Sequence, residues 1–277
     1  MAVPPPRLWP VFVAYVLAFV TIVSFSLIAA VMVRAAYPEL SEHEVFDGLP
    51  GLLAGGLASS AALLVTVSIV ARPLEPARLR LVPGRETGDQ LAAMILGTLA
   101  LGQLLDSATA LAGLGNRGAM AVIRRAIEGA AGPELFASVV VIGVLAGSAE
   151  ELFFRGYMQG RLRERWPVPI AVVVTSAAFG LLHLEWLHAG LAVVLGVWLG
   201  LITERAGSAL PAVAAHVINN VVFTVITATA GTLQDRSLNL ALLTFSAVLF
   251  LACVLWIWRL SAPRPAPGAP GAPGGRR

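Results

Sequence analysis

Apolar runs close to 20 residues long recur along this 277-residue chain, and they constrain its fold more than any other feature. A stretch of that length is what one helix needs to cross the hydrocarbon core of a membrane. Charged residues make up only 13% of the chain, against roughly 25% in soluble domains. We therefore predict an all-α, polytopic transmembrane helix bundle. Its eight predicted spans are residues 9–33, 50–71, 91–112, 134–155, 168–185, 189–204, 209–229 and 238–259.

The arginines predict how this bundle is oriented. All 19 basic residues are arginines, and basic loops stay preferentially on the cytoplasmic side of a membrane. If the N-terminus is cytoplasmic, eight spans place 14 arginines in cytoplasmic segments and 5 in external ones. We therefore predict a multi-pass protein of the cell membrane with both termini in the cytoplasm. The net charge of +3 is then a topology signal and does not indicate nucleic-acid binding.

The chain divides into one predicted domain and a tail. Residues 1–260 are predicted to form a single integral membrane domain with its catalytic core at about 134–228, whereas the Pro-, Gly- and Arg-rich residues 261–277 are predicted to be disordered. Residues 116–131 fit either a short amphipathic helix at the external interface or a plain loop. No glycine-rich phosphate loop follows a strand, so nucleotide binding has no support.

Two adjacent acids and an arginine interrupt the span predicted at 134–155. A charge inside a membrane is costly, so Glu150, Glu151 and Arg155 require a partner or a function. Adjacent helical residues point about 100° apart, whereas Glu151 and Arg155, four residues apart, share a face and can neutralise each other. Glu150 is then the carboxylate without a local partner, suited to accepting and returning a proton.

Histidines on later spans complete this polar set. If the spans on either side of residues 166–167 form an antiparallel hairpin, Glu150 and His183 lie at nearly the same depth. His216 and Asn220, four residues apart on the seventh span, share a face, although their depth relative to Glu150 does not follow from the sequence.

These residues provide the groups needed for hydrolysis by activated water. Glu150 and His183 would hold and deprotonate the water, while His216 and Asn220 would donate hydrogen bonds to the tetrahedral oxyanion. Glu150, His183 and His216 are also an acceptable zinc ligand set. We favour the metal-free reading because the chain has no His-Glu-x-x-His signature.

Three motifs in this order carry a family resemblance: Glu-Glu-x-x-x-Arg at 150–155, Phe-x-x-x-His at 179–183 and His-x-x-x-Asn at 216–220. Together they resemble the CPBP (ABI) intramembrane proteases, which comprise type II CAAX prenyl endopeptidases and bacteriocin-processing and self-immunity relatives. The resemblance implies an intramembrane endopeptidase, commonly labelled a metalloprotease, that acts on a peptide or lipidated protein substrate in the lipid membrane. It also implies that Glu151 and Arg155 support the site. It does not identify the substrate or say whether it is prenylated.

Other readings of the same residues stay open. Glu151 and Arg155 fit a purely structural pair, and His216 with Asn220 fits hydrogen bonding between helices. The function could then be proton-coupled transport, or a non-enzymatic immunity or scaffold role. Asp106 is interpreted as part of a local hydrogen-bond cluster, and residues 185–188 as an anchor at the external interface.

Overall fold

The computed structural model describes residues 7–260, and every regular element in that range is helical. The predicted disordered tail, residues 261–277, lies outside the described residues. In chain order the elements are α1 (Trp9–Ala36), α2 (Glu42–Phe46), α3 (Leu49–Val70), α4 (Gly88–Leu111), α5 (Gly118–Ile127), α6 (Gly132–Ser138), η1 (Val139–Ala146), α7 (Gly147–Glu151), η2 (Leu152–Met158), α8 (Gln159–Arg163), α9 (Val168–Leu181), α10 (Trp186–Ala206), α11 (Leu210–Ala230), α12 (Arg236–Leu255) and η3 (Trp256–Leu260).

Seven of the eight predicted spans contain a helix that is long and apolar enough to cross a membrane. The exception is α9, whose 14 residues rise only about 21 Å, whereas the hydrocarbon core is about 30 Å thick. Residues 168–185 were predicted as one span, but the helix ends at Leu181 and the chain turns through residues 182–185 into α10. The prediction of an all-α, polytopic bundle is confirmed.

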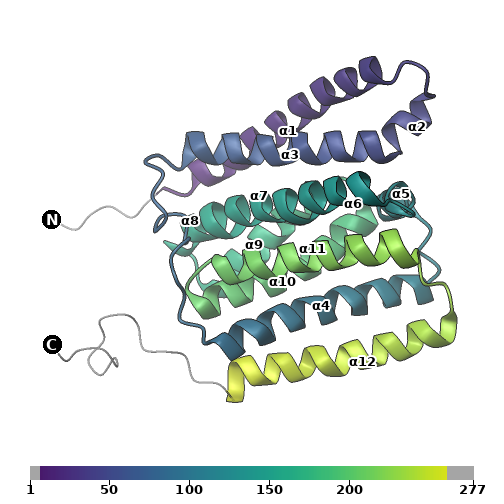
Figure 1. Cartoon of the computed structure of the whole chain (residues 1–277). Coiled ribbons are helices and arrows are strands. Elements are labelled where there is room, and N and C mark those ends of the chain that lie inside the picture. The colour runs from purple at the N-terminus through teal and green to yellow at the C-terminus, as the bar shows by residue number, and fades with distance from the viewer. Residues whose placement is uncertain (1–6, 261–277) are drawn as a thin grey trace, which may run out of the picture.

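Figure 1 shows how the helices are layered. The antiparallel pair α1 and α3 lies on one side, the continuous rod from α6 to α8 lies next, and α4 with α12 closes the opposite side. Helix α11 packs between the rod and α4, and α9 packs against α10. The start of α1 and the end of α12 lie at the same end of the bundle, as the predicted placement of both termini in the cytoplasm requires.

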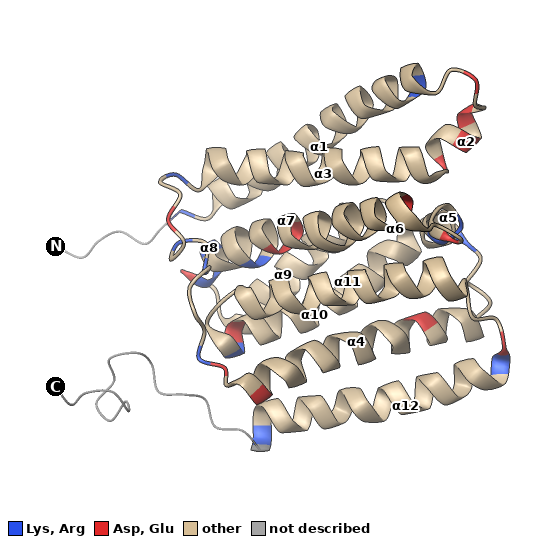
Figure 2. Ribbon diagram, in the orientation of Figure 1, with Lys and Arg blue, Asp and Glu red and all other residues tan. Residues whose placement is uncertain are grey.

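Charged residues collect at the two ends of the helices, where water and lipid headgroups would solvate them (Figure 2). The exceptions lie along the rod near α7 and along α4. A charge in mid-membrane persists where it has a partner or a function, so these two regions are the candidates for a functional site.

The rod is continuous but not uniformly α-helical. Seven or eight residues on each side of α7, in η1 and η2, have π-helical hydrogen bonding. Such turns change which side chains share a face, and they occur frequently at functional sites. The two adjacent glutamates therefore lie on the short α-helical segment between two π-helical segments.

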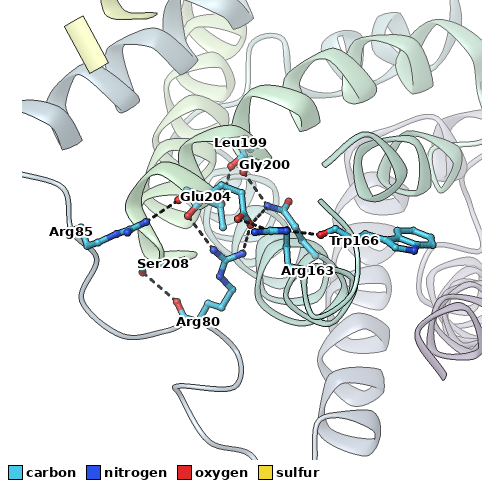
Figure 3. Close-up of polar contacts among 10 residues, drawn as sticks. Arg80, Arg85, Arg163, Trp166, Leu199, Gly200, Glu204 and Ser208 are labelled. Atoms are coloured by element: carbon cyan, nitrogen blue, oxygen red, sulfur yellow. Dashed lines mark hydrogen bonds and ion pairs between the residues drawn. The ribbon is translucent and has the colours of Figure 1, made fainter. Parts of the chain in front are cut away.

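At one end of the bundle, a polar cluster around Glu204 joins α10 to α8 and to the α3–α4 connection (Figure 3). Glu204 Oε1 accepts hydrogen bonds from Arg80 Nη1 at 2.6 Å and from Gln159 Nε2 at 2.9 Å, while Oε2 accepts from Arg163 Nε at 3.0 Å. Arg85 Nη2 donates to the Glu204 backbone carbonyl. The cluster fixes the connection between α3 and α4 against the ends of two other helices.

Candidate active site

A cavity of about 300 Å³ lies within the helix bundle. Four of the predicted site residues line it, from α7, the end of α9 and α11: Glu150, His183, His216 and Asn220. The remaining wall is largely apolar, with side chains such as Leu105, Ile142 and Phe223. The structure thus brings to one cavity residues that lie up to 70 positions apart in the chain.

Glu151 and Arg155 form the predicted ion pair, which is confirmed. Arg155 Nη1 donates to Glu151 Oε1 at 2.6 Å, and both side chains are completely buried. Arg155 Nη2 also donates to the Gly196 carbonyl at 3.0 Å, and its guanidinium lies 4.9 Å from the centre of the Phe179 ring. Glu151 Oε2 and Arg155 Nε have no hydrogen-bond partner among the described residues. The pair is deeply buried and only partly satisfied.

The His216 ring lies between the two glutamates. Its Nδ1 is 2.8 Å from Glu151 Oε1, and its Nε2 is 3.7 Å from Glu150 Oε2. Adjacent helical residues point in different directions, as the sequence predicted, and the result is one carboxylate at each nitrogen of one imidazole. The sequence had paired Glu150 with His183, but the imidazole nearer to its carboxylate is that of His216.

His183 is held from the side opposite the cavity. Its Nδ1 lies 3.0 Å from the Phe179 backbone carbonyl oxygen. Because a carbonyl oxygen only accepts hydrogen bonds, Nδ1 carries the proton and Nε2 is left with a free lone pair. The Phe179 ring also packs edge-on against the His183 ring, with centroids 5.0 Å apart, so Phe179 packs against the site as expected. His183 is therefore ready to accept a hydrogen bond from water.

Asn220 is oriented by its neighbour. Asn219 Nδ2 donates to Asn220 Oδ1 at 3.3 Å, and Asn220 Nδ2 is 3.4 Å from the Ile142 carbonyl, a long and weak hydrogen bond. Asn219 also lines the cavity. With Oδ1 engaged, the amide group of Asn220 is the donor available for a ligand.

Two glycines on the rod determine the depth of α11. A Cβ at Gly143 would lie 2.6 Å from Val221 Cγ2, and a Cβ at Gly147 would lie 3.4 Å from the Val217 backbone nitrogen. Glycines four residues apart let neighbouring helices approach closely. This Gly-x-x-x-Gly pattern was not used to predict the depth of His216, and it is the sequence signal that could have indicated that depth.

Two cavity residues were assigned to other places by sequence reasoning. His188 was expected to anchor the external interface, yet its ring lines the cavity 4.1 Å, centroid to centroid, from that of His183. Asp106 was expected to join a local cluster, yet its carboxylate pairs with Arg124 of α5 across the cavity wall. Gln103 Nε2 does donate to Ser107 Oγ, so part of the expected cluster exists.

Helix α5 covers one side of the cavity. Of the two alternatives for residues 116–131, the structure has the helix, and its residues Met120, Ile123 and Ile127 line the cavity. The helix packs against α3, α10 and α11, so it is a wall of the site and not only an interfacial element.

The alternative metal ligands do not form a metal site in this arrangement. Glu150, His183 and His216 all line the cavity. Among residues 7–260, however, no three His, Cys, Asp or Glu side chains are grouped so that they could hold a metal ion.

Comparison with known proteins identifies one family. Residues 132–222, about a third of the chain, match the family model described as type II CAAX prenyl endopeptidase Rce1-like. The match runs from α6 into α11 and includes all six predicted site residues. No curated protein and no solved structure matches the chain. The chain carries an Rce1-like domain, consistent with the CPBP family, and with its apolar helices this indicates a multi-pass integral membrane protein and an intramembrane endopeptidase in general.

Proposed function

We propose that this protein hydrolyses peptide bonds of membrane-associated substrates with water activated by Glu150 and His183. The observation that carries the proposal is the convergence of Glu150, His183, His216 and Asn220 on one cavity inside an apolar bundle. A carboxylate, two imidazoles and a carboxamide are the groups that water activation and oxyanion binding need. The Rce1-like match over the same helices supports the assignment.

Water would be activated between Glu150 and His183. Glu150 makes no hydrogen bond with the described residues, and its side chain is 22% exposed toward the cavity, so its carboxylate can take a proton. The Nε2 lone pair of His183 accepts the second hydrogen bond of the same water and orients it. As the water oxygen attacks the peptide carbonyl, Glu150 takes the proton and then transfers it to the leaving amine nitrogen.

The oxyanion would be bound by His216 and Asn220. Since Nδ1 of His216 donates to Glu151, donation from Nε2 as well requires that the ring carry both protons. The Nδ2 group of Asn220 is the second donor. Glu151 and Arg155 therefore support the site through His216.

We propose a mechanism with no step through a metal ion, because side chains that line the cavity provide both the base and the oxyanion donors that it needs. Activity is expected to persist after stringent chelation. Loss of cleavage on chelation, with recovery when zinc is added back, would overturn this part of the proposal and favour the zinc alternative.

The substrate is proposed to be a peptide or lipidated protein that reaches the cavity from the membrane. The largely apolar lining suits an apolar chain next to the scissile bond, and the family name points to prenylated proteins as one class. We propose that the protein lies in the cell membrane. The proposal involves neither nucleotides nor nucleic acids.

The test is cleavage of membrane-anchored peptides, with and without a prenylated cysteine, by the purified protein in liposomes. Glu150→Gln is expected to lower the cleavage rate at least about a hundredfold, since general acid–base catalysis contributes that much. Glu164→Gln is the matched control, because Glu164 pairs with Arg161 outside the cavity. Normal cleavage by the Glu150→Gln protein would refute the proposal.

Two outcomes would favour the alternatives. Substrate-dependent proton flux into liposomes without any cleavage would indicate a transporter. A cellular phenotype that is unchanged in the Glu150→Gln variant would indicate a non-enzymatic immunity or scaffold protein.

A further inference from the structure

The short turn between α9 and α10 places two imidazoles side by side. His183 ends the turn that follows α9, and His188 lies in the first turn of α10. Their ring centroids are 4.1 Å apart, and their planes are inclined by 60°. Both rings line the cavity that holds Glu150 and His216. His188 has no part in the mechanism above, so its place beside His183 needs a separate explanation.

The backbone of this turn is held firmly. Leu184 has a φ of 59°, a left-handed conformation that is unfavourable for a residue with a branched side chain. Such backbones persist where the surrounding structure imposes them, often at functional sites. Glu185 helps to hold this backbone conformation, because its carboxylate accepts hydrogen bonds from the backbone nitrogens of Leu187 and His188, each at 3.0 Å. The positions of both histidine backbones are thereby fixed.

The His183 ring is confined by Phe179 and His188. Phe179 provides the backbone carbonyl that accepts from Nδ1 and the aromatic ring that packs edge-on at 5.0 Å. His188 packs against the His183 ring at 4.1 Å. A single hydrogen bond leaves an imidazole free to rock or to flip, whereas a second ring packed against it removes that freedom.

His188 itself has no competing hydrogen bond. Its side chain makes no hydrogen bond with residues 7–260, so its ring is not there to satisfy another polar group. We propose that His188 is a positioning residue that holds the His183 ring with Nδ1 on the Phe179 carbonyl and Nε2 directed into the cavity. The catalytic part of this inference rests on the proposed function, whereas the orientation of His183 can be measured without it.

The test compares His188→Ala, which removes the ring, with His188→Phe, which keeps an aromatic ring of similar width. The chain has four histidines, so the ¹⁵N spectrum of protein labelled at histidine is simple, and replacing each histidine in turn assigns it. In the wild-type protein and in His188→Phe, His183 is expected to show one tautomer protonated at Nδ1. In His188→Ala, its signal is expected to broaden or to become an average of two tautomers.

Activity provides the second measurement. His188→Ala is expected to lower kcat about tenfold with KM changed less than about threefold, because a misplaced group is costly in the chemical step. His188→Phe is expected to restore kcat to within about threefold of the wild-type value. Trp186→Ala is the matched control, since Trp186 is 71% exposed on the same turn and does not line the cavity.

An unchanged His183 tautomer in His188→Ala would overturn the proposal, as would a kcat equally low in His188→Phe and His188→Ala. The signals of His216 and His43 in each variant report whether the fold is intact. If the wild-type protein cleaves nothing, the proposed function fails, yet the tautomer of His183 still tests the positioning role.

Discussion

Two clusters in this protein are each centred on a glutamate bonded to arginine, and they differ in how completely the two carboxylate oxygens are paired. At Glu204, Arg80 and Gln159 donate to one carboxylate oxygen and Arg163 to the other. In the middle of the bundle, Arg155 and His216 donate to a single oxygen of Glu151, while its other oxygen and Arg155 Nε have no partner among the described residues. The side chain of Glu150, next to it, makes no hydrogen bond with the described residues, and its carboxylate lies 3.7 Å from His216 Nε2.

The two clusters differ in role: the charges around Glu204 stabilise the fold, whereas the carboxylate of Glu150 stays available to a ligand. The Glu204 cluster lies at a helix end, where several arginines and water can reach it, and its carboxylate joins three parts of the chain (Figure 3). The Glu150–Glu151 cluster lies at mid-bundle, where an unpaired polar atom is costly. Of its three charged side chains only Glu150 lines the cavity, where a water molecule and a substrate would provide hydrogen-bond partners for its carboxylate.

The largest effect is expected from Arg155→Met, which leaves Glu151 as a buried charge with only His216 beside it. Removal of one partner of a buried ion pair typically costs about 3–5 kcal/mol. We expect a loss of that size in the free energy of unfolding, measured by denaturation in mixed micelles. Arg163→Met should cost less, because Glu204 keeps Arg80 and Gln159. Equal losses would show that the two clusters do not differ as described.

The second prediction exchanges each glutamate for glutamine. Glu150→Gln should lower the cleavage rate at least about a hundredfold. It should leave stability nearly unchanged, because the Glu150 side chain has no hydrogen bond with the described residues to lose. Glu204→Gln should do the reverse, with cleavage within about twofold and a stability loss of about 1–3 kcal/mol, because charged hydrogen bonds are weakened. Cleavage rates and unfolding curves of the same preparations decide this. A Glu204→Gln protein that is stable but inactive would contradict the assignment of a stabilising role to Glu204 and a catalytic role to Glu150.

The third prediction concerns the contact that brings His216 to Glu151. In Gly143→Ala the new Cβ would collide with Val221, so we expect a loss of about 1–3 kcal/mol and lower activity as α11 moves outward. Gly55→Ala is the control in another span, where a Cβ meets nothing within 4 Å, and it should be neutral or stabilising by up to about 1 kcal/mol. Retention of full activity in Gly143→Ala would show that the site tolerates movement of α11.

The smallest effect is expected at the wall of the cavity. Asp106→Asn removes the charge that holds Arg124 of α5, and these side chains are 22% and 14% exposed. We expect a stability change of about 1 kcal/mol or less, as for ion pairs that water can reach. The measurement is hydrogen exchange, which we expect to be faster only at residues 118–127. Exchange that accelerates equally in α10 and α11 would show that the pair stabilises the whole bundle.

Several features followed from the sequence because they depend on local spacing. Apolar runs predicted the spanning helices, and the four-residue interval predicted that Glu151 and Arg155 would pair. The turn at residues 166–167 exists, and it brings Glu150 and His183 to the same cavity. These inferences need only the rise and the turn of a helix.

Other features were not predicted from the sequence because they depend on contacts between segments far apart in the chain. Packing between the helices pairs Asp106 with Arg124. The same packing places Glu150 nearer to His216 than to His183. In the sequence, His188 resembles an interfacial residue because Glu185 and Trp186 beside it are charged and aromatic residues of the kind that anchor helices at an interface. The left-handed backbone at Leu184 then turns the chain so that His188 lies on the inner side.

The sequence by itself determined that this chain forms apolar helices and that one of them carries two acids and an arginine, because helix length and helical phase are local properties. Helical spacing also paired Glu151 with Arg155 and left Glu150 without a local partner. Only the tertiary structure decided that the ring of His216 lies next to both carboxylates. The close approach of α11 to the rod at Gly143 and Gly147 places one imidazole between the two glutamates. The Gly-x-x-x-Gly pattern permits that approach, but packing between segments 65 residues apart in sequence decides which helix fills the place.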